Sequence, residues 1–115
     1  MTRDKLFLVR PDFADAAYPG HRFYCWHCAL IEGLIASFSD LLTKIDVERI
    51  DWPKPRRAII DLVGEESQSV PLLILARDAP KDIVANTYRG TRFVNDKDAI
   101  LALLHRRHGI PEPHP

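Results

Sequence analysis

The tetrapeptide Cys25-Trp26-His27-Cys28 holds the only two cysteines of the 115-residue chain. Two thiols at this spacing can attack a disulfide and then close into a disulfide of their own. Because an apolar segment of helical period begins here, we expect Cys25 at a helix start, where free backbone N–H groups favour a thiolate. Cys25 is then the candidate nucleophile, and Cys28, about one turn further in, is the candidate resolving thiol. The other interpretation is a pair of inert buried thiols.

The two residues between the cysteines have two interpretations each. His27 can donate a hydrogen bond or a positive charge to the Cys25 thiolate, which also destabilises a disulfide. It can equally be a solvated residue at a helix start. Trp26 either offers a docking surface to an apolar substrate or packs against the loop at residues 11–24.

The same cysteines have the spacing of half a zinc site, and His21 could supply a third ligand. The sequence has no second Cys-x-x-Cys, and the remaining histidines apart from His27 lie at 105, 108 and 114. We therefore expect no bound metal, with Cys25, Cys28 and His21 as the alternative ligand set.

Charge and composition narrow the class of protein. Sixteen basic residues balance sixteen acidic ones, which gives no support for nucleic acid or an anionic membrane as a partner. No apolar run reaches the roughly 20 residues that span a bilayer, and the apolar stretch 6–9 is too short for a signal peptide. We expect a cytoplasmic protein with one domain over residues 1–115, a core at about 5–109 and a loose tail at 110–115.

Hydrophobic periodicity predicts an alternation of strands and helices. Strands are expected at 5–10, 47–52, 72–75 and 92–94, the third as a continuous apolar strand of the fully buried kind. Helices are expected from Cys25 to Ile45, with a break or new cap at Ser39-Asp40, over 55–63 with Gly64 as its C-cap, and from a cap at Asn95 or Asp96 to Gly109. Residues 11–24 and 76–91 are predicted to be long loops.

This order of elements resembles the thioredoxin superfamily, nearest to its glutaredoxin-like and glutathione-transferase-N-domain-like branches. The resemblance covers about residues 5–109 and is carried by the Cys-x-x-Cys that opens the first helix and by Val70-Pro71 before the third strand. The segment Arg-Phe-Tyr-Cys-Trp-His-Cys is also similar to that of an uncharacterised bacterial family. The resemblance implies an α/β, thioredoxin-like fold of order β-α-β-α-β-β-α, with a four-stranded mixed sheet flanked by helices on both faces.

The resemblance also implies a substrate ledge at Val70-Pro71. In the superfamily this proline is cis and faces the active-site cysteine, and the backbone before it pairs with an extended peptide or with glutathione. From the residues alone, a trans proline that opens a strand remains the other interpretation.

Four further residues could contact glutathione. Asn95 and Asp96 lie where an acidic or hydroxyl residue of glutathione-binding relatives holds the γ-glutamyl group, although a helix cap alone also explains them. Arg22 and Arg92 could pair with a glutathione carboxylate, or be solvated surface arginines.

We therefore expect a thiol–disulfide oxidoreductase that uses the dithiol on a protein disulfide or on glutathione, with no cofactor other than glutathione as co-substrate. The alternative is a non-catalytic binding or sensor module of the same fold, whose dithiol is a redox switch or a metal clip. The loops at 11–24 and 76–91 would then form its partner surface.

Overall fold

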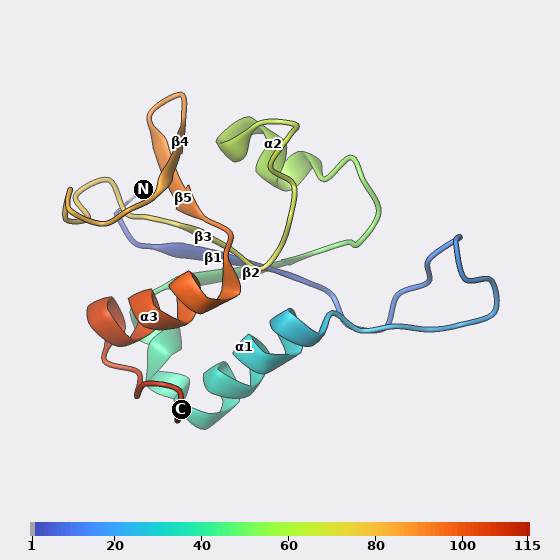
Figure 1. Ribbon diagram of the computed structural model, residues 1–115, viewed down its shortest axis with the longest axis horizontal. Helices are drawn as coiled ribbons and strands as arrows, with labels where there is room; N and C mark the ends of the chain where they lie inside the picture. The colour runs from blue at the N-terminus through green and yellow to red at the C-terminus, as the bar shows by residue number, and fades with distance from the viewer. Residues whose placement is uncertain (1) are drawn as a thin grey trace.

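Strand β1 (Lys5–Val9) lies inside the sheet of the computed structural model, which describes residues 2–115 (Figure 1). The sheet has the order β2-β1-β3-β5-β4. Its other strands are β2 (Asp46–Ile50), β3 (Leu72–Ile74), β4 (Asn86–Tyr88) and β5 (Thr91–Val94). Only β1 and β2 are parallel, with Leu6 opposite Val47, and each remaining pair is antiparallel. The α/β class and the mixed sheet are therefore confirmed.

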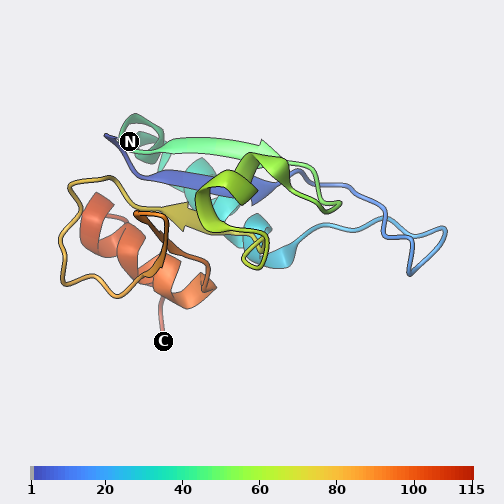
Figure 2. The same cartoon turned by 90° about the horizontal axis from the view of Figure 1, so that it is seen from above.

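Helices cover both faces of this sheet, as Figures 1 and 2 show from two directions. Helices α1 (Trp26–Ser37) and α3 (Lys97–His108) lie on one face, and α2 (Arg57–Val63) lies on the other. A short 3-10 helix, η1 (Ser39–Thr43), follows α1 and leads into β2. Helix α1 thus lies in the crossover that two parallel strands require. None of the described helices has the length and apolar character that crossing a membrane demands.

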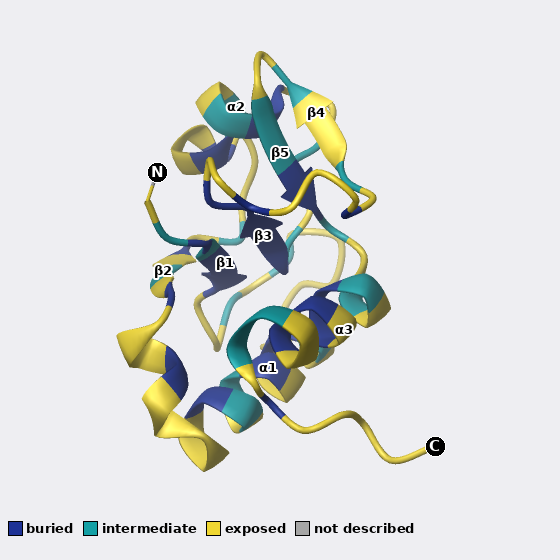
Figure 3. Ribbon diagram, turned by 90° about the vertical axis from the view of Figure 1, so that its left-hand side faces the viewer, coloured by how far each residue is buried: buried dark blue, intermediate teal, exposed yellow. Residues whose placement is uncertain are grey.

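Alternate residues of β1 supply the two hydrophobic cores, because successive side chains of a strand point to opposite faces. Leu6 and Leu8 pack in the core that contains Ile31 of α1. Phe7 packs in the second core, which contains Ile59 of α2. Figure 3 shows β1 and β3 as buried throughout most of their length, which explains why both were recognisable as apolar runs.

The sheet has five strands rather than the four predicted. Strand β4 lies inside the segment 76–91, which was predicted to be a loop, so that prediction was wrong there. Its residues Asn86, Thr87 and Tyr88 have no apolar alternation, and the first two are exposed at the sheet edge. The turn at Arg89-Gly90, where both residues have positive φ, joins β4 to β5 in a hairpin.

Several predicted helix boundaries are confirmed, and others differ from the structure by a few residues. Helix α1 ends at Ser37, so the break expected near Ser39-Asp40 is present. Helix α2 begins at Arg57, two residues later than expected. Of the two candidate caps of α3, Asp96 accepts the hydrogen bond from the Ala99 N–H at 2.9 Å.

Residues 110–115 were expected to be a loose tail, and the structure differs from this expectation at residue 110. Gly109 adopts the left-handed conformation that ends α3, with φ of 75°. Ile110 then turns back and is only 5% exposed, so the packed part of the domain extends through this residue.

Candidate functional site

Cys25 is the N-cap residue of α1, the position that Ser, Thr, Asp or Asn usually occupies. Its Sγ accepts a hydrogen bond from the Cys28 backbone N–H at 3.3 Å. The first turn of α1 contains no acidic side chain. The Cys25 sulfur therefore receives a free N–H group and lies at the positive end of the helix dipole, a position where reactive cysteines are found.

Cys28 lies one turn further into α1 and is only 2% exposed. Its Sγ accepts a hydrogen bond from the Val9 N–H of β1 at 3.5 Å. Burial raises the pKa of the Cys28 thiol to about 12, and the neighbouring Cys25 sulfur and the Glu32 carboxylate add to this rise. Both cysteines are free thiols. The pair therefore combines one accessible sulfur at a helix start with one protonated sulfur behind it.

The raised pKa predicts how Cys28 reacts with an alkylating agent. In a Cys25→Ser variant, where burial and Glu32 still raise the pKa of the thiol, iodoacetamide should modify Cys28 slowly at pH 7, and the rate should still be rising at pH 10. Mass spectrometry of the folded protein measures this rate. The same variant unfolded in urea is the control, since an exposed thiol has a pKa of about 8.5 and its rate should level off by about pH 10. The same levelling off in the folded protein would contradict the raised pKa.

The two thiols line a cavity of about 250 Å³. Its lining residues are Val9, Pro11, Tyr24, Cys25, Cys28, Ala29 and Glu32. Glu32 is the only charged side chain among them, and Arg49 of β2 binds its carboxylate with two hydrogen bonds of 2.8 and 2.7 Å. The space next to the sulfurs is therefore mainly apolar, and the one charge on its rim is already paired.

Exposed aromatic side chains flank the accessible thiol. Tyr24 is 68% exposed and Trp26 is 71% exposed. The Trp26 ring lies against the His27 imidazole, with centroids 4.2 Å apart. Within residues 2–115, no hydrogen bond joins His27 to either sulfur. Trp26 therefore offers an apolar surface next to Cys25, and the geometry gives His27 no direct bond to the thiolate.

Arg56 is a buried guanidinium that sequence analysis missed, because an arginine before a helix gives no signal of burial. It is 9% exposed, and it donates to the carbonyl oxygens of Trp52 at 2.9 Å and of Gln68 at 2.6 Å. Burial lowers the pKa of Arg56, whereas attraction by Cys28 and Cys25 acts in the opposite direction. A positive charge thus lies near both sulfurs.

Residues 3–112 match the model of a family described as "Protein of unknown function (DUF3088)". The chain belongs to this family. No curated protein and no solved structure matches the chain. The expectation of an uncharacterised family is therefore confirmed.

The cis bond expected at Val70-Pro71 of this DUF3088 protein is present, whereas its role as a ledge facing Cys25 stays a prediction. Pro71 is buried and Val70 is half-buried, and Val70 packs against the core that Cys25 also contacts. A second cis bond, Lys54–Pro55, was not expected.

The remaining expected contacts do not line the thiol cavity of the DUF3088 protein. Arg22 binds the Asp12 carboxylate through its Nε at 2.8 Å, and Arg92 donates to backbone carbonyls of residues 79–83. Asp96 caps α3, and Asn95 precedes it outside the cavity.

The alternative metal site is not assembled either. The His21 ring stacks on Phe23, with centroids 6.2 Å apart. In the described part of the chain, residues 2–115, no group of three His, Cys, Asp or Glu side chains is placed to hold an ion.

The segment 11–24 forms a hairpin that projects from the domain and leads directly to Cys25 (Figure 1, right). Phe13 and Phe23 exchange backbone hydrogen bonds of 2.9 and 2.8 Å. The Phe13 ring stacks on Trp52 at 5.2 Å, and Trp52 is the residue whose carbonyl holds Arg56. The hairpin, the buried guanidinium and the thiol pair therefore belong to one packed unit.

Proposed function

We propose that this DUF3088 protein is a thiol–disulfide oxidoreductase of thioredoxin-like fold. The observation that carries the proposal is the hydrogen bond from the Cys28 N–H to the Cys25 Sγ at the start of α1, with the Cys28 thiol buried behind it. This arrangement separates the roles of the two sulfurs, since one is accessible at the start of a helix while the other is buried and held protonated.

The order of the strands supports the thioredoxin-like part of the proposal. Strand β1 pairs in parallel with β2 and antiparallel with β3, and β3 pairs antiparallel with β5. With β4 and the short η1 set aside, the remaining elements follow the order expected from the resemblance, and Val70-Pro71 precedes β3. Strand β4 is then an addition at the sheet edge.

The proposed reaction is a two-electron exchange. The Cys25 thiolate attacks one sulfur of a substrate disulfide, the S–S bond of the substrate breaks, and the leaving sulfur departs as a thiolate and takes up a proton. Cys28 then loses its proton and attacks the Cys25 sulfur, which releases the second substrate thiol and leaves a Cys25–Cys28 disulfide. The substrate is reduced and the protein is oxidised, and an external thiol reductant must restore the dithiol.

Arg56 favours the charged state of the first step. Its guanidinium is held by two carbonyl oxygens rather than by a carboxylate, so its positive charge is not neutralised by an acid. A fixed positive charge near the sulfurs lowers the free energy of the thiolate relative to the thiol.

The surroundings of the thiols favour a protein disulfide over glutathione as the substrate. Glutathione carries two carboxylates, which cationic side chains usually bind. Near the site, Arg49 is paired with Glu32 and Arg22 with Asp12, and the Arg56 guanidinium is buried on carbonyl oxygens rather than exposed to a carboxylate. The apolar cavity and the exposed rings of Trp26 and Tyr24 instead suit a protein segment with apolar side chains beside its cysteine.

The reduction potential of the Cys25–Cys28 pair tests this function. The protein is equilibrated in glutathione and dithiothreitol buffers, and free thiols are counted by mass spectrometry after alkylation. We expect a reversible two-electron transition between about −120 and −270 mV, the range of catalytic dithiols. A protein that shows no transition, or whose thiols react only after a chelator is added, would contradict the oxidoreductase and favour a metal clip.

A further inference from the structure

A second cavity, of about 450 Å³, lies between α2, the end of β3 and the β4–β5 turn. Its charged lining residues are Arg77, Arg89 and Arg92, and no acidic residue lines it. Leu62 and Ile74 supply apolar wall. The cavity shares no lining residue with the thiol cavity, so the proposed redox chemistry does not explain it.

These three arginines differ from most others in the chain. Most arginines have a carboxylate within 4.0 Å, namely Arg3, Arg10, Arg22, Arg49, Arg106 and Arg107. Among residues 2–115, no carboxylate lies within that distance of Arg77, Arg89 or Arg92. Although the chain has zero net charge, three arginines without a carboxylate partner therefore line this one cavity.

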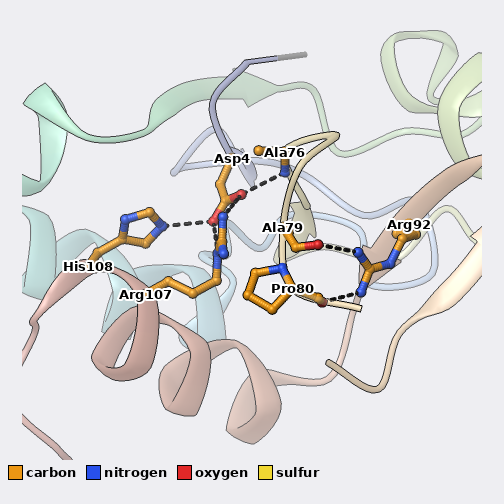
Figure 4. Close-up of polar contacts among 7 residues, drawn as sticks. All are labelled: Asp4, Ala76, Ala79, Pro80, Arg92, Arg107 and His108. Atoms are coloured by element: carbon orange, nitrogen blue, oxygen red, sulfur yellow. Dashed lines mark hydrogen bonds and ion pairs between the residues drawn. The ribbon is translucent and has the colours of Figure 1, made fainter. Parts of the chain in front are cut away.

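Arg92 is held in place before any ligand binds. Its guanidinium donates to the carbonyl oxygens of Ala79 at 3.0 Å and of Pro80 at 2.8 Å, as Figure 4 shows, and to that of Ile83 at 3.3 Å. Carbonyl oxygens orient a guanidinium but do not neutralise it. None of these three carbonyl-bearing residues lines the cavity, so Arg92 adds positive charge at the cavity wall while its hydrogen-bonding groups are held by the segment 79–83.

Arg89 brings a second cation to the rim from the hairpin turn. It has φ of 47° and Gly90 has φ of 82°. Turns of this kind favour Asn, Asp or Gly, so an arginine is an unusual residue there. Its guanidinium lies over the Tyr88 ring at 5.2 Å, which limits its freedom. The acidic residues Asp61, Glu65 and Glu66 line a neighbouring hollow that also contains Arg89, and they do not line this cavity.

We propose that this cavity binds a small organic phosphate. The forks of Arg77 and Arg89 match the oxygens of a phosphate group in geometry and charge, and the positive charge of Arg92 adds to the attraction of a dianion. The volume falls within the range of small-molecule sites. The apolar side chains of Leu62 and Ile74 then contact the organic part of the ligand.

The test is an NMR titration of the full chain, labelled with ¹⁵N, using inorganic phosphate and adenosine monophosphate as probes. Adenosine monophosphate should cause saturable shifts of the amides of residues 76–77 and 89–92 and should bind more tightly than phosphate alone. Arg77→Gln and Arg89→Gln should each weaken this binding at least about tenfold, because each removes a charge-assisted contact. Both side chains are exposed, so the fold should tolerate these changes.

Arg57→Gln is the matched control, since Arg57 also lacks a carboxylate partner in the described residues but lies outside the cavity. It should leave the affinity unchanged. Equal losses in Arg57→Gln and Arg77→Gln would overturn the site and indicate unspecific attraction. Absence of saturable shifts would overturn it too. Equal affinity for phosphate and for adenosine monophosphate would mean that the organic part of the ligand adds no binding, which would overturn the proposal of an organic phosphate.

Discussion

Replacing the Cys25 thiol by a hydroxyl is expected to abolish disulfide exchange. Cys25→Ser should lower the rate of release of a thiol from a disulfide-linked peptide at least about 10³-fold, because a serine hydroxyl is not ionised at neutral pH. The fold should be preserved, since serine is a favoured N-cap and can accept the hydrogen bond that Cys28 N–H now gives to Cys25 Sγ. Unchanged circular dichroism with lost exchange would therefore assign the loss to chemistry.

Cys28→Ser is the matched variant, because it removes the other thiol of the same turn. The first attack by Cys25 should proceed, and the mixed disulfide should accumulate, since no second thiol releases the substrate. Mass spectrometry without reductant should show the protein with one peptide attached. If Cys28→Ser turned over like the unchanged protein, the two-thiol mechanism would fail. If Cys25→Ser still exchanged, the assignment of the nucleophile would fail.

The sequence predicted those elements of the fold whose signal is local. Strands β1 and β3 are buried on both faces and were recognisable as continuous apolar runs. The ends of α1 and α3 followed from Ser39-Asp40 and Gly109. Strand β4 could not be found in this way, because its pairing with β5 supplies the stability that its polar residues do not encode.

In the candidate site, too, the sequence predicted the residues that are neighbours in the chain and missed those that only the fold brings together. Cys25 and Cys28 are neighbours in sequence, so their spacing alone indicated a dithiol at a helix start. Arg56 lies 28 residues beyond Cys28, and only the fold brings its charge close to the sulfurs. The expected glutathione contacts at Arg22 and Asp96 were plausible by position. Each side chain is instead satisfied within the chain, by Asp12 and by the N–H of Ala99.

Asp4 is the clearest case of a polar residue whose role depends on distant partners, and its removal should strongly destabilise the fold. Its fully buried carboxylate accepts from the Ala76 N–H at 2.7 Å and from Arg107 Nε at 2.7 Å, with His108 Nε2 at 2.8 Å (Figure 4). Asp4→Ala leaves all three groups without their acceptor, two of them on α3. The free energy of unfolding in urea should fall by about 3–5 kcal/mol.

A second Asp–Arg pair on the same turn of α3 provides the control for Asp4→Ala. Arg106 binds Asp82 with hydrogen bonds of 2.9 and 3.0 Å, but the Asp82 side chain is 71% exposed. Asp82→Ala should cost only about 0.2–1 kcal/mol, because an exposed ion pair contributes little. Equal losses in the two variants would show that burial of Asp4 does not govern its contribution.

The contribution of Asp4 should also depend on pH, in a direction set by its hydrogen bonds. Burial raises the pKa of the Asp4 carboxyl, but the bonds from His108, Arg107 and the Ala76 N–H outweigh it and hold the pKa well below its usual 3.8. A carboxyl with a lowered folded-state pKa stabilises the fold fully above the unfolded-state value, and this stability is lost as the pH falls below it. The difference in unfolding free energy between the unchanged protein and Asp4→Asn, which keeps the shape of the side chain, should therefore be constant from pH 7 to about pH 5 and shrink towards pH 2. A difference that grew on acidification would mean that Asp4 is protonated in the folded protein, and that Arg107 is held by something other than its charge.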